Sequence, residues 1–270
     1  MGATLAIVNL ADSATLSTTS GTMLLPLTQL QVPWARGLAR GPSNYTSGTT
    51  ALVLRADLGS AKDFVCLGIA GLNDAVAAAP DVRYSNTAFG NTDRGTATMA
   101  NDGLNGDTHG NSLWTVGAVY CRYIEIYIEV YALPLGLRYV DARRLLIMQA
   151  GCLLSDGVDF DWSLTHIDQS TAQVTPRGGV FTDTQGTFRE LQFGVSGMTA
   201  TEAEDLRTWI AAARKTTEIV VSLRDEDTDT LQSNRTIYGR LVSWSPIEHQ
   251  GGDYYKCDSI TVHETPYPAL

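Results

Sequence analysis

Few side chains in this sequence stand at spacings that support catalysis. The sequence contains no G-x-S-x-G nucleophile motif, no H-E-x-x-H zinc motif, no Walker-type phosphate loop and no G-x-G-x-x-G segment leading into a helix. Its histidines have no cysteine or serine partner at a recognisable spacing; they are His109, His166, His249 and His263. We therefore expect no enzymatic activity, and the alternative is a polysaccharide hydrolase built from paired carboxylates.

The clearest pair of carboxylates, Glu125 and Glu129, lies in the segment Arg122–Val130, R-Y-I-E-I-Y-I-E-V. Apolar and polar residues alternate there, as in a strand with one face on a core. The isoleucines mark the core face, so the glutamates share the opposite face with Tyr123 and Tyr127. We expect a solvated sheet face here rather than a catalytic site.

Two tracts rich in acidic and amide residues raise the question of metal binding. Asn86–Asn111 consists largely of Gly, Asn, Asp and Thr, and it includes Asp102 and Asp107. A tract of this kind is typical of a functional or interface loop. Its spacing fits neither an EF-hand nor a Gly-rich calcium repeat, so a plain flexible loop is the main hypothesis and calcium binding the alternative. The acidic stretch Asp225–Asp229 is interpreted as a solvated hairpin tip, with metal binding again as the alternative.

The four cysteines are far apart and form no C-x-x-C pair; they are Cys66, Cys121, Cys152 and Cys257. Metal and iron–sulfur sites usually show closely spaced ligand pairs. We expect reduced thiols in a hydrophobic core, in a protein made in a reducing compartment. No cofactor and no metal are predicted.

The charge of the chain is unevenly distributed. The 270 residues carry a formal net charge of −10, which argues against a specific nucleic-acid-binding surface. Residues 1–150 hold 10 Lys+Arg and 11 Asp+Glu, a balance of −1, and residues 151–270 hold the other 9 and 18, a balance of −9. This step predicts two domains, 1–150 and 151–270, that divide near residues 150–156.

No apolar run approaches the roughly 18 residues that a membrane span requires, so we expect no membrane insertion. The N-terminal segment also lacks the basic region of a secretory signal.

The stretch Ala51–Asn73 is expected to organise the first domain. Two apolar runs, Ala51–Leu58 and Phe64–Leu72, flank a turn-like segment, Gly59–Lys62. The first run alternates, and the second is apolar at nearly every position, as in a strand with little access to solvent. We predict two core strands of an antiparallel sheet, separated by a turn.

The second domain is predicted to be a β-sandwich or barrel with one flanking helix. Thr199 and Glu202 form a capping box, so a helix is expected over about residues 200–214. Its apolar stripe consists of Ala203, Leu206, Trp209, Ile210 and Ala213. Strands are expected at Glu218–Leu223, Thr236–Trp244 and Tyr254–His263.

Five short segments of the first domain carry a family resemblance. They are Asp57–Ser60 (D-L-G-S), Val65–Asn73 (V-C-L-G-I-A-G-L-N), Trp114–Val116 (W-T-V), Cys121–Ile126 (C-R-Y-I-E-I) and Ala142–Ile147 (A-R-R-L-L-I). In this order they resemble the discoidin-like, galactose-binding-type jelly roll found in many phage tail proteins. The resemblance covers about the first 150 residues and implies a jelly-roll β-sandwich.

The second domain, by its element order, resembles the β-sandwich with a flanking helix of phage tail tube and distal tail proteins. Together the two resemblances imply a structural component of a phage tail tip, located in the virion and made in the bacterial host cytoplasm. Such a protein would form a ring, a hexamer or a trimer, that contacts tail tube and baseplate hub proteins and conducts DNA. The acidic second domain would line the channel and repel phosphates.

The alternative function is a carbohydrate-binding module for host-surface glycans. Its candidate contacts are the aromatic residues Trp34, Tyr45 and Trp114, together with the loop residues Asp102 and Asp107. The same five residues are the candidates for interface contacts if the protein is a tail component.

Overall fold

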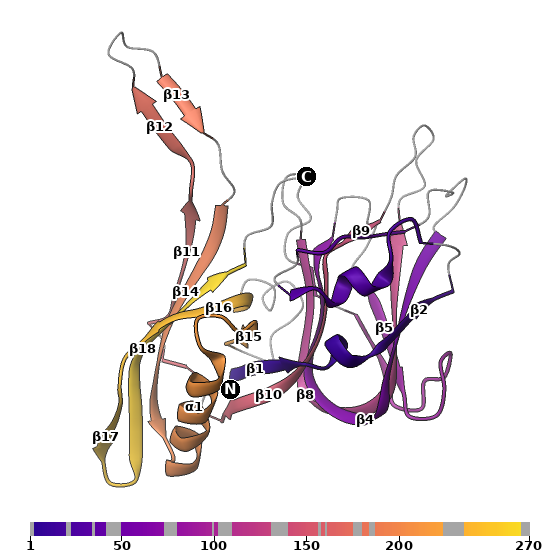
Figure 1. Ribbon diagram of the computed structural model, residues 1–270. Helices are drawn as coiled ribbons and strands as arrows, with labels where there is room; N and C mark the ends of the chain where they lie inside the picture. Colours follow the sequence, from indigo (N-terminus) through magenta and orange to yellow (C-terminus); the bar gives the residue numbers. More distant parts are fainter. Residues whose placement is uncertain are drawn as a thin grey trace.

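A computed structural model shows that the chain has the predicted fold class. It is mainly β, with a jelly-roll sandwich in the first half and a second β unit that carries a helix (Figure 1). The structure describes residues 3–19, 23–33, 36–41, 50–72, 80–98, 100–101, 110–130, 140–155, 158–159, 161–174, 180–183, 187–223 and 235–265. No helix among these residues is long and apolar enough to span a membrane.

Fourteen of the described strands form one antiparallel sheet, in which the main order is β11-β14-β18-β16-β15-β1-β10-β4-β8-β5-β6. Two short 3-10 helices, η1 (Leu10–Ser13) and η2 (Leu27–Gln31), lie beside the sandwich. The strands of the first half are β1 (Ala3–Asn9), β2 (Thr15–Thr18), β3 (Ala39–Arg40), β4 (Thr50–Leu72), β5 (Asp81–Ser85), β6 (Gly95–Thr98), β7 (Ala100–Asn101), β8 (Gly110–Val130), β9 (Asp141–Ala142) and β10 (Arg144–Leu154).

In the second half, β15, β16 and β18 correspond to the three strands predicted after the helix, and β17, which the sequence pattern did not indicate, forms a hairpin with β18. The short pair β12–β13 extends the hairpin of β11 and β14 away from the rest of the chain (Figure 1). The elements are β11 (Ser163–Asp168), β12 (Thr171–Val174), β13 (Val180–Asp183), β14 (Thr187–Met198), α1 (Ala200–Ala213), β15 (Ile219–Ser222), β16 (Thr236–Trp244), β17 (Ile247–Gly251) and β18 (Tyr254–Glu264).

The predicted pair of strands in Ala51–Asn73 is instead one long strand, β4. Both of its apolar runs pair with β8, which is long enough to follow them from Thr50 to Leu72. The register shifts between Asp57 and Lys62, so the turn-like segment is a bulge rather than a hairpin. Gly59 adopts a φ of 76° there and donates its amide to the Asp57 carboxylate. At this bulge the two strands bend from one sheet of the sandwich into the other (Figure 1).

The second half of β4 is buried on both faces, as its apolar sequence predicted. One face, with Phe64, Leu67 and Ile69, belongs to the core of the sandwich. The other face, with Val65 and Cys66, packs against residues of the second half of the chain. All four cysteines are buried free thiols, as expected, and burial raises the pKa of the Cys66 thiol.

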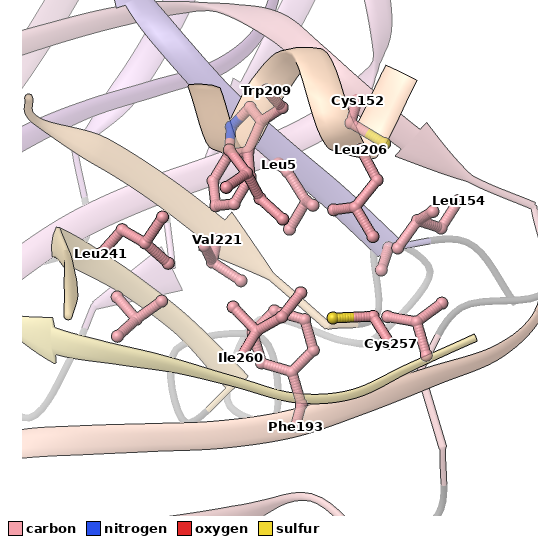
Figure 2. Close-up of a cluster of buried hydrophobic side chains, with 14 of the residues drawn as sticks. Leu5, Cys152, Leu154, Phe193, Leu206, Trp209, Val221, Leu241, Cys257 and Ile260 are labelled. Carbon is pink, nitrogen blue, oxygen red and sulfur yellow. The ribbon is translucent and has the colours of Figure 1, made fainter. Parts of the chain in front are cut away.

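Helix α1 confirms the sequence prediction closely. Thr199 is the N-cap, Glu202 completes the capping box, and the five residues of the predicted apolar stripe are buried. Figure 2 shows Leu206 and Trp209 of the helix beside Leu5 of β1 and Cys152 of β10. Gly151 makes this close approach possible, because a Cβ atom there would lie 2.4 Å from the Trp209 ring.

Strands β1 and β10 belong to both halves of the molecule. Strand β1 pairs with β10 on one side and with β15, from the second half, on the other. Within β10, Leu145 and Ile147 lie in the sandwich core, whereas Cys152 and Leu154 lie in the second core. A strand therefore runs through residue 150, and the division into domains near residues 150–156 stays a prediction.

A buried arginine ties the two halves together. Arg144 of β10 has a fully buried side chain and forms ion pairs with Asp12 at 2.6 Å and Glu218 at 2.5 Å. Tyr238 of β16 donates its hydroxyl to Glu218, and Arg144 also donates to the carbonyl oxygen of Leu30. Burial alone would lower the pKa of Arg144, but the two carboxylates outweigh it and raise that pKa.

We predict that Arg144→Ala lowers the free energy of unfolding by about 3–5 kcal/mol, because it leaves buried carboxylate charge without its partner. Urea denaturation of the full chain measures this. The matched control is Arg240→Ala, at an exposed position of β16, which is expected to change stability by no more than about 0.5 kcal/mol. Equal stability of the two variants would contradict the role given to Arg144.

Candidate functional site

The sandwich has two outer faces with different surroundings. The face behind the second half of β4 is covered, because Val65 and Cys66 pack with Val220 and Tyr238. The opposite outer face belongs to the sheet β2-β4-β8-β5-β6, and it carries exposed residues such as Arg83 of β5. A ligand therefore has access to the second of these faces.

Charged and aromatic side chains gather on this accessible face. The strand register places Arg55 of β4 and Arg83 of β5 on either side of Glu125, and Asp57 opposite Tyr123. We call the group the polar face; it consists of Arg55, Asp57, Arg83, Phe89, Arg122, Tyr123, Glu125 and Tyr127.

Glu125 is not solvated, contrary to the sequence prediction. It is only 2% exposed, and its two oxygens accept hydrogen bonds from Arg55 Nε at 2.8 Å and from the Gly90 amide at 2.6 Å. Phe89 lies beside it, with the Arg55 guanidinium 5.0 Å from the ring centre. The strand pattern could not show this burial, because the covering residues come from a loop about 35 positions earlier in the chain.

A second ion pair fixes the end of the polar face next to the β4 bulge. Arg122 donates to both oxygens of Asp57, from Nε at 2.7 Å and from Nη2 at 2.9 Å. The hydrogen bond from Arg122 holds the pKa of Asp57 below its ordinary value, against the opposing effect of burial. The same guanidinium lies 4.7 Å from the ring centre of Tyr123, whose other neighbour is Phe89.

The third arginine of the polar face has no carboxylate partner among the described residues. Arg83 lies over the Tyr127 ring, 4.4 Å from its centre, and Arg83 Nη1 donates to the Tyr127 hydroxyl at 3.4 Å. Both side chains are accessible, Arg83 exposed and Tyr127 partly so. Such a platform can stack against an apolar surface of a ligand and donate hydrogen bonds along its edge.

Most of the candidate contacts predicted from the sequence cannot be placed. Trp34, Tyr45, Asp102 and Asp107 lie outside the described residues, as does the acidic stretch 225–229. Trp114 lies in β8 opposite Leu67, but its side chain is outside the described part. All five stay predictions.

The residues of the polar face were missed for an identifiable reason. The alternation in Arg122–Val130 placed Tyr123, Glu125 and Tyr127 on one face, but the partners on β4 and β5 depend on strand register. Register is set by long-range pairing, which the local sequence does not contain.

Two of the described histidines have polar neighbours in the second half of the chain. His263 contacts Glu190 at 2.5 Å and lies beside Phe188, and His249 contacts the carbonyl of Gly252. No cluster of three potential metal ligands occurs among the described residues.

No protein-family model matches this sequence, and the search of curated proteins gives no match. Solved structures that are similar to part of this chain include the lectin domain of lectinolysin complexed with Lewis B antigen, with 14% identity and a TM-score of 0.39 over 53% of this chain and 96% of that domain. Another is the family 32 carbohydrate-binding module of NanJ from C. perfringens in complex with galactose, with 15% identity and a TM-score of 0.39 over 54% and 99%.

A third similar structure, SpGH29, has 13% identity and a TM-score of 0.35; the likeness spans 53% of this chain but only 28% of SpGH29. All three likenesses are low in sequence identity and involve about half of this chain. The ligands of these proteins therefore say nothing by themselves about what this chain binds.

We predict that Glu125→Ala releases the loop segment around Gly90. A hydrogen bond to a charged group contributes about 1.5–3 kcal/mol, so amide exchange at Gly90 should become at least about tenfold faster. Hydrogen exchange over residues 86–94 measures this. The control Glu204→Ala removes an exposed ion pair with Arg207 on α1 and should leave this exchange unchanged. Unaltered protection in Glu125→Ala would show that Glu125 does not hold the loop.

Proposed function

We propose that this chain binds carbohydrate through the polar face of its jelly-roll half. One observation carries the proposal. An accessible sheet face combines aromatic rings with arginine side chains that can donate hydrogen bonds and that the rings hold in a fixed orientation. Arg83 lies over Tyr127, and Arg122 lies over Tyr123. No catalytic step is part of the proposal.

The physical requirements of sugar recognition match this arrangement. A sugar ring presents an apolar surface of C–H groups that packs on aromatic rings, and hydroxyl groups that need hydrogen-bond partners. The ion pair of Asp57 with Arg122 fixes these polar groups before a ligand arrives, which lowers the entropy lost on binding. The partly exposed phenol ring of Tyr127 supports the planar guanidinium of Arg83, which lies over it.

We expect Tyr127→Ala to weaken glycan binding at least tenfold, a loss of about 1.4 kcal/mol, because it removes the ring that supports Arg83. A glycan array with neutral and acidic oligosaccharides identifies the ligand, and titration calorimetry gives the affinity. Tyr254→Ala is the control, since Tyr254 is also an exposed tyrosine but lies at the β17–β18 hairpin. Unweakened binding by Tyr127→Ala would reject the polar face as the site, provided that both variants keep the thermal stability of the parent.

A second candidate function is the structural component of a phage tail tip that the sequence resemblance implies. The projecting hairpin supports it: β12 and β13 pair only with each other among the described strands, and Thr171, Ala172 and Thr182 on them are exposed. An isolated two-stranded hairpin is marginally stable in water, so an extension of this kind favours contact with another protein. The partners would be further copies of the chain, tail tube proteins and baseplate hub proteins, with the acidic second half lining a channel for DNA.

If this second function holds, the full chain should form a ring, a hexamer or a trimer. Removal of residues 171–183 should give a monomer, because the hairpin extension would be the contact between copies. Light scattering after size-exclusion chromatography measures the mass. The control Leu24→Ala changes an exposed apolar residue near the sandwich and should leave the mass unchanged. A monomeric full chain at micromolar concentration would count against self-assembly.

A further inference from the structure

We propose that Arg83 and Tyr127 form a subsite that selects sugars carrying a carboxylate group. This inference rests on the proposed carbohydrate-binding function and adds the ligand class. It follows from a comparison of two kinds of polar side chain on the polar face: those whose hydrogen-bonding groups are paired with one another, and those whose donors remain available to a ligand.

The carboxylate opposite Arg83 in the sheet already accepts two hydrogen bonds from other residues. Glu125 lies directly opposite Arg83 in the register of β5 and β8. Its two oxygens are taken by Arg55 Nε and by the Gly90 amide, at 2.8 and 2.6 Å. Within the described part of the chain, Arg83 donates to the Tyr127 hydroxyl and forms no ion pair.

The guanidinium of Arg83 is also held in a defined orientation. It lies over the Tyr127 ring, which restricts the rotation of a long side chain, and Nη1 donates to the Tyr127 hydroxyl, so the donors left for a ligand are the others along its edge. On the same face, Arg122 shows how the edge of a guanidinium binds a carboxylate: it donates from Nε and Nη2 to both oxygens of Asp57. A carboxylate on a ligand would meet Arg83 in this two-point geometry.

Long-range electrostatic attraction between the protein surface and an anionic sugar contributes little to this selectivity. Asp81 lies two residues before Arg83 on the same face of β5, and Glu125 lies opposite, so the surroundings of Arg83 are not strongly positive. The preference for a carboxylate must then come from direct contact with the planar guanidinium. A lysine would keep the charge but lose the two-point contact and the stacking on Tyr127.

The test uses uronic-acid oligosaccharides, each compared with its carboxyl-reduced neutral form, on an array and by titration calorimetry with the full chain. The parent protein is expected to bind the acidic form at least tenfold more tightly than the neutral form. Arg83→Gln should bind both forms with equal affinity, and Arg83→Lys should lose most of the preference. Arg240→Gln, at an exposed arginine in the second half, is the control and should retain it.

The outcomes separate the two proposals. If the parent binds neither form of any oligosaccharide, the carbohydrate-binding function itself is contradicted. If the parent binds both forms equally, or if Arg83→Gln retains the preference for the acidic form, the subsite is wrong while the carbohydrate function stands. Because Arg83 is exposed, these variants should fold, and thermal unfolding of each variant confirms that a lost preference reflects the side chain.

Discussion

The burial of Arg144 is the constraint on which the arrangement of the two halves depends. A guanidinium without access to water must be surrounded by acceptors, and these come from distant parts of the chain: Asp12 after β1, and Glu218 before β15. Tyr238 completes the group; burial first, and then the neighbouring Glu218 carboxylate, raise the pKa of its hydroxyl well above the ordinary value. Buried ion pairs add little net stability, but they penalise arrangements in which the partners are separated. The cluster therefore specifies how the halves meet.

The long bent strands β4 and β8 explain why one outer face of the sandwich is free. Each strand contributes to both sheets, and the second half of β4 is apolar on both sides, which suits its position between the two cores. The first half of β4 alternates, with Leu52 and Leu54 inward and Arg55 and Asp57 on the polar face. The candidate site is thus located where the sequence changes from continuous to alternating hydrophobicity.

The elements that could be predicted from the sequence are those with local signals. The capping box at Thr199 and the apolar stripe through Trp209 define α1 without reference to other segments. The segment Gly59–Lys62 resembles a turn locally, yet it is a bulge because β8 continues past it as a single partner.

The candidate site could not be predicted from the sequence, because its arrangement depends on contacts between segments that are far apart in the chain. The burial of Glu125 required the loop that contains Gly90, and the position of Arg83 beside Tyr127 required the register of β5 on β8.

The pairing of strand β1 has a consequence for the order in which the chain folds. The strand pairs with β15, so Leu5 must wait for Val221, more than 200 residues later, before its sheet is complete. During synthesis, the second core stays open until β15 and the strands after it have been made, and contacts of such sequence separation slow folding. Strand β1, although made before the other described strands, is thus among the last of them to be fully paired.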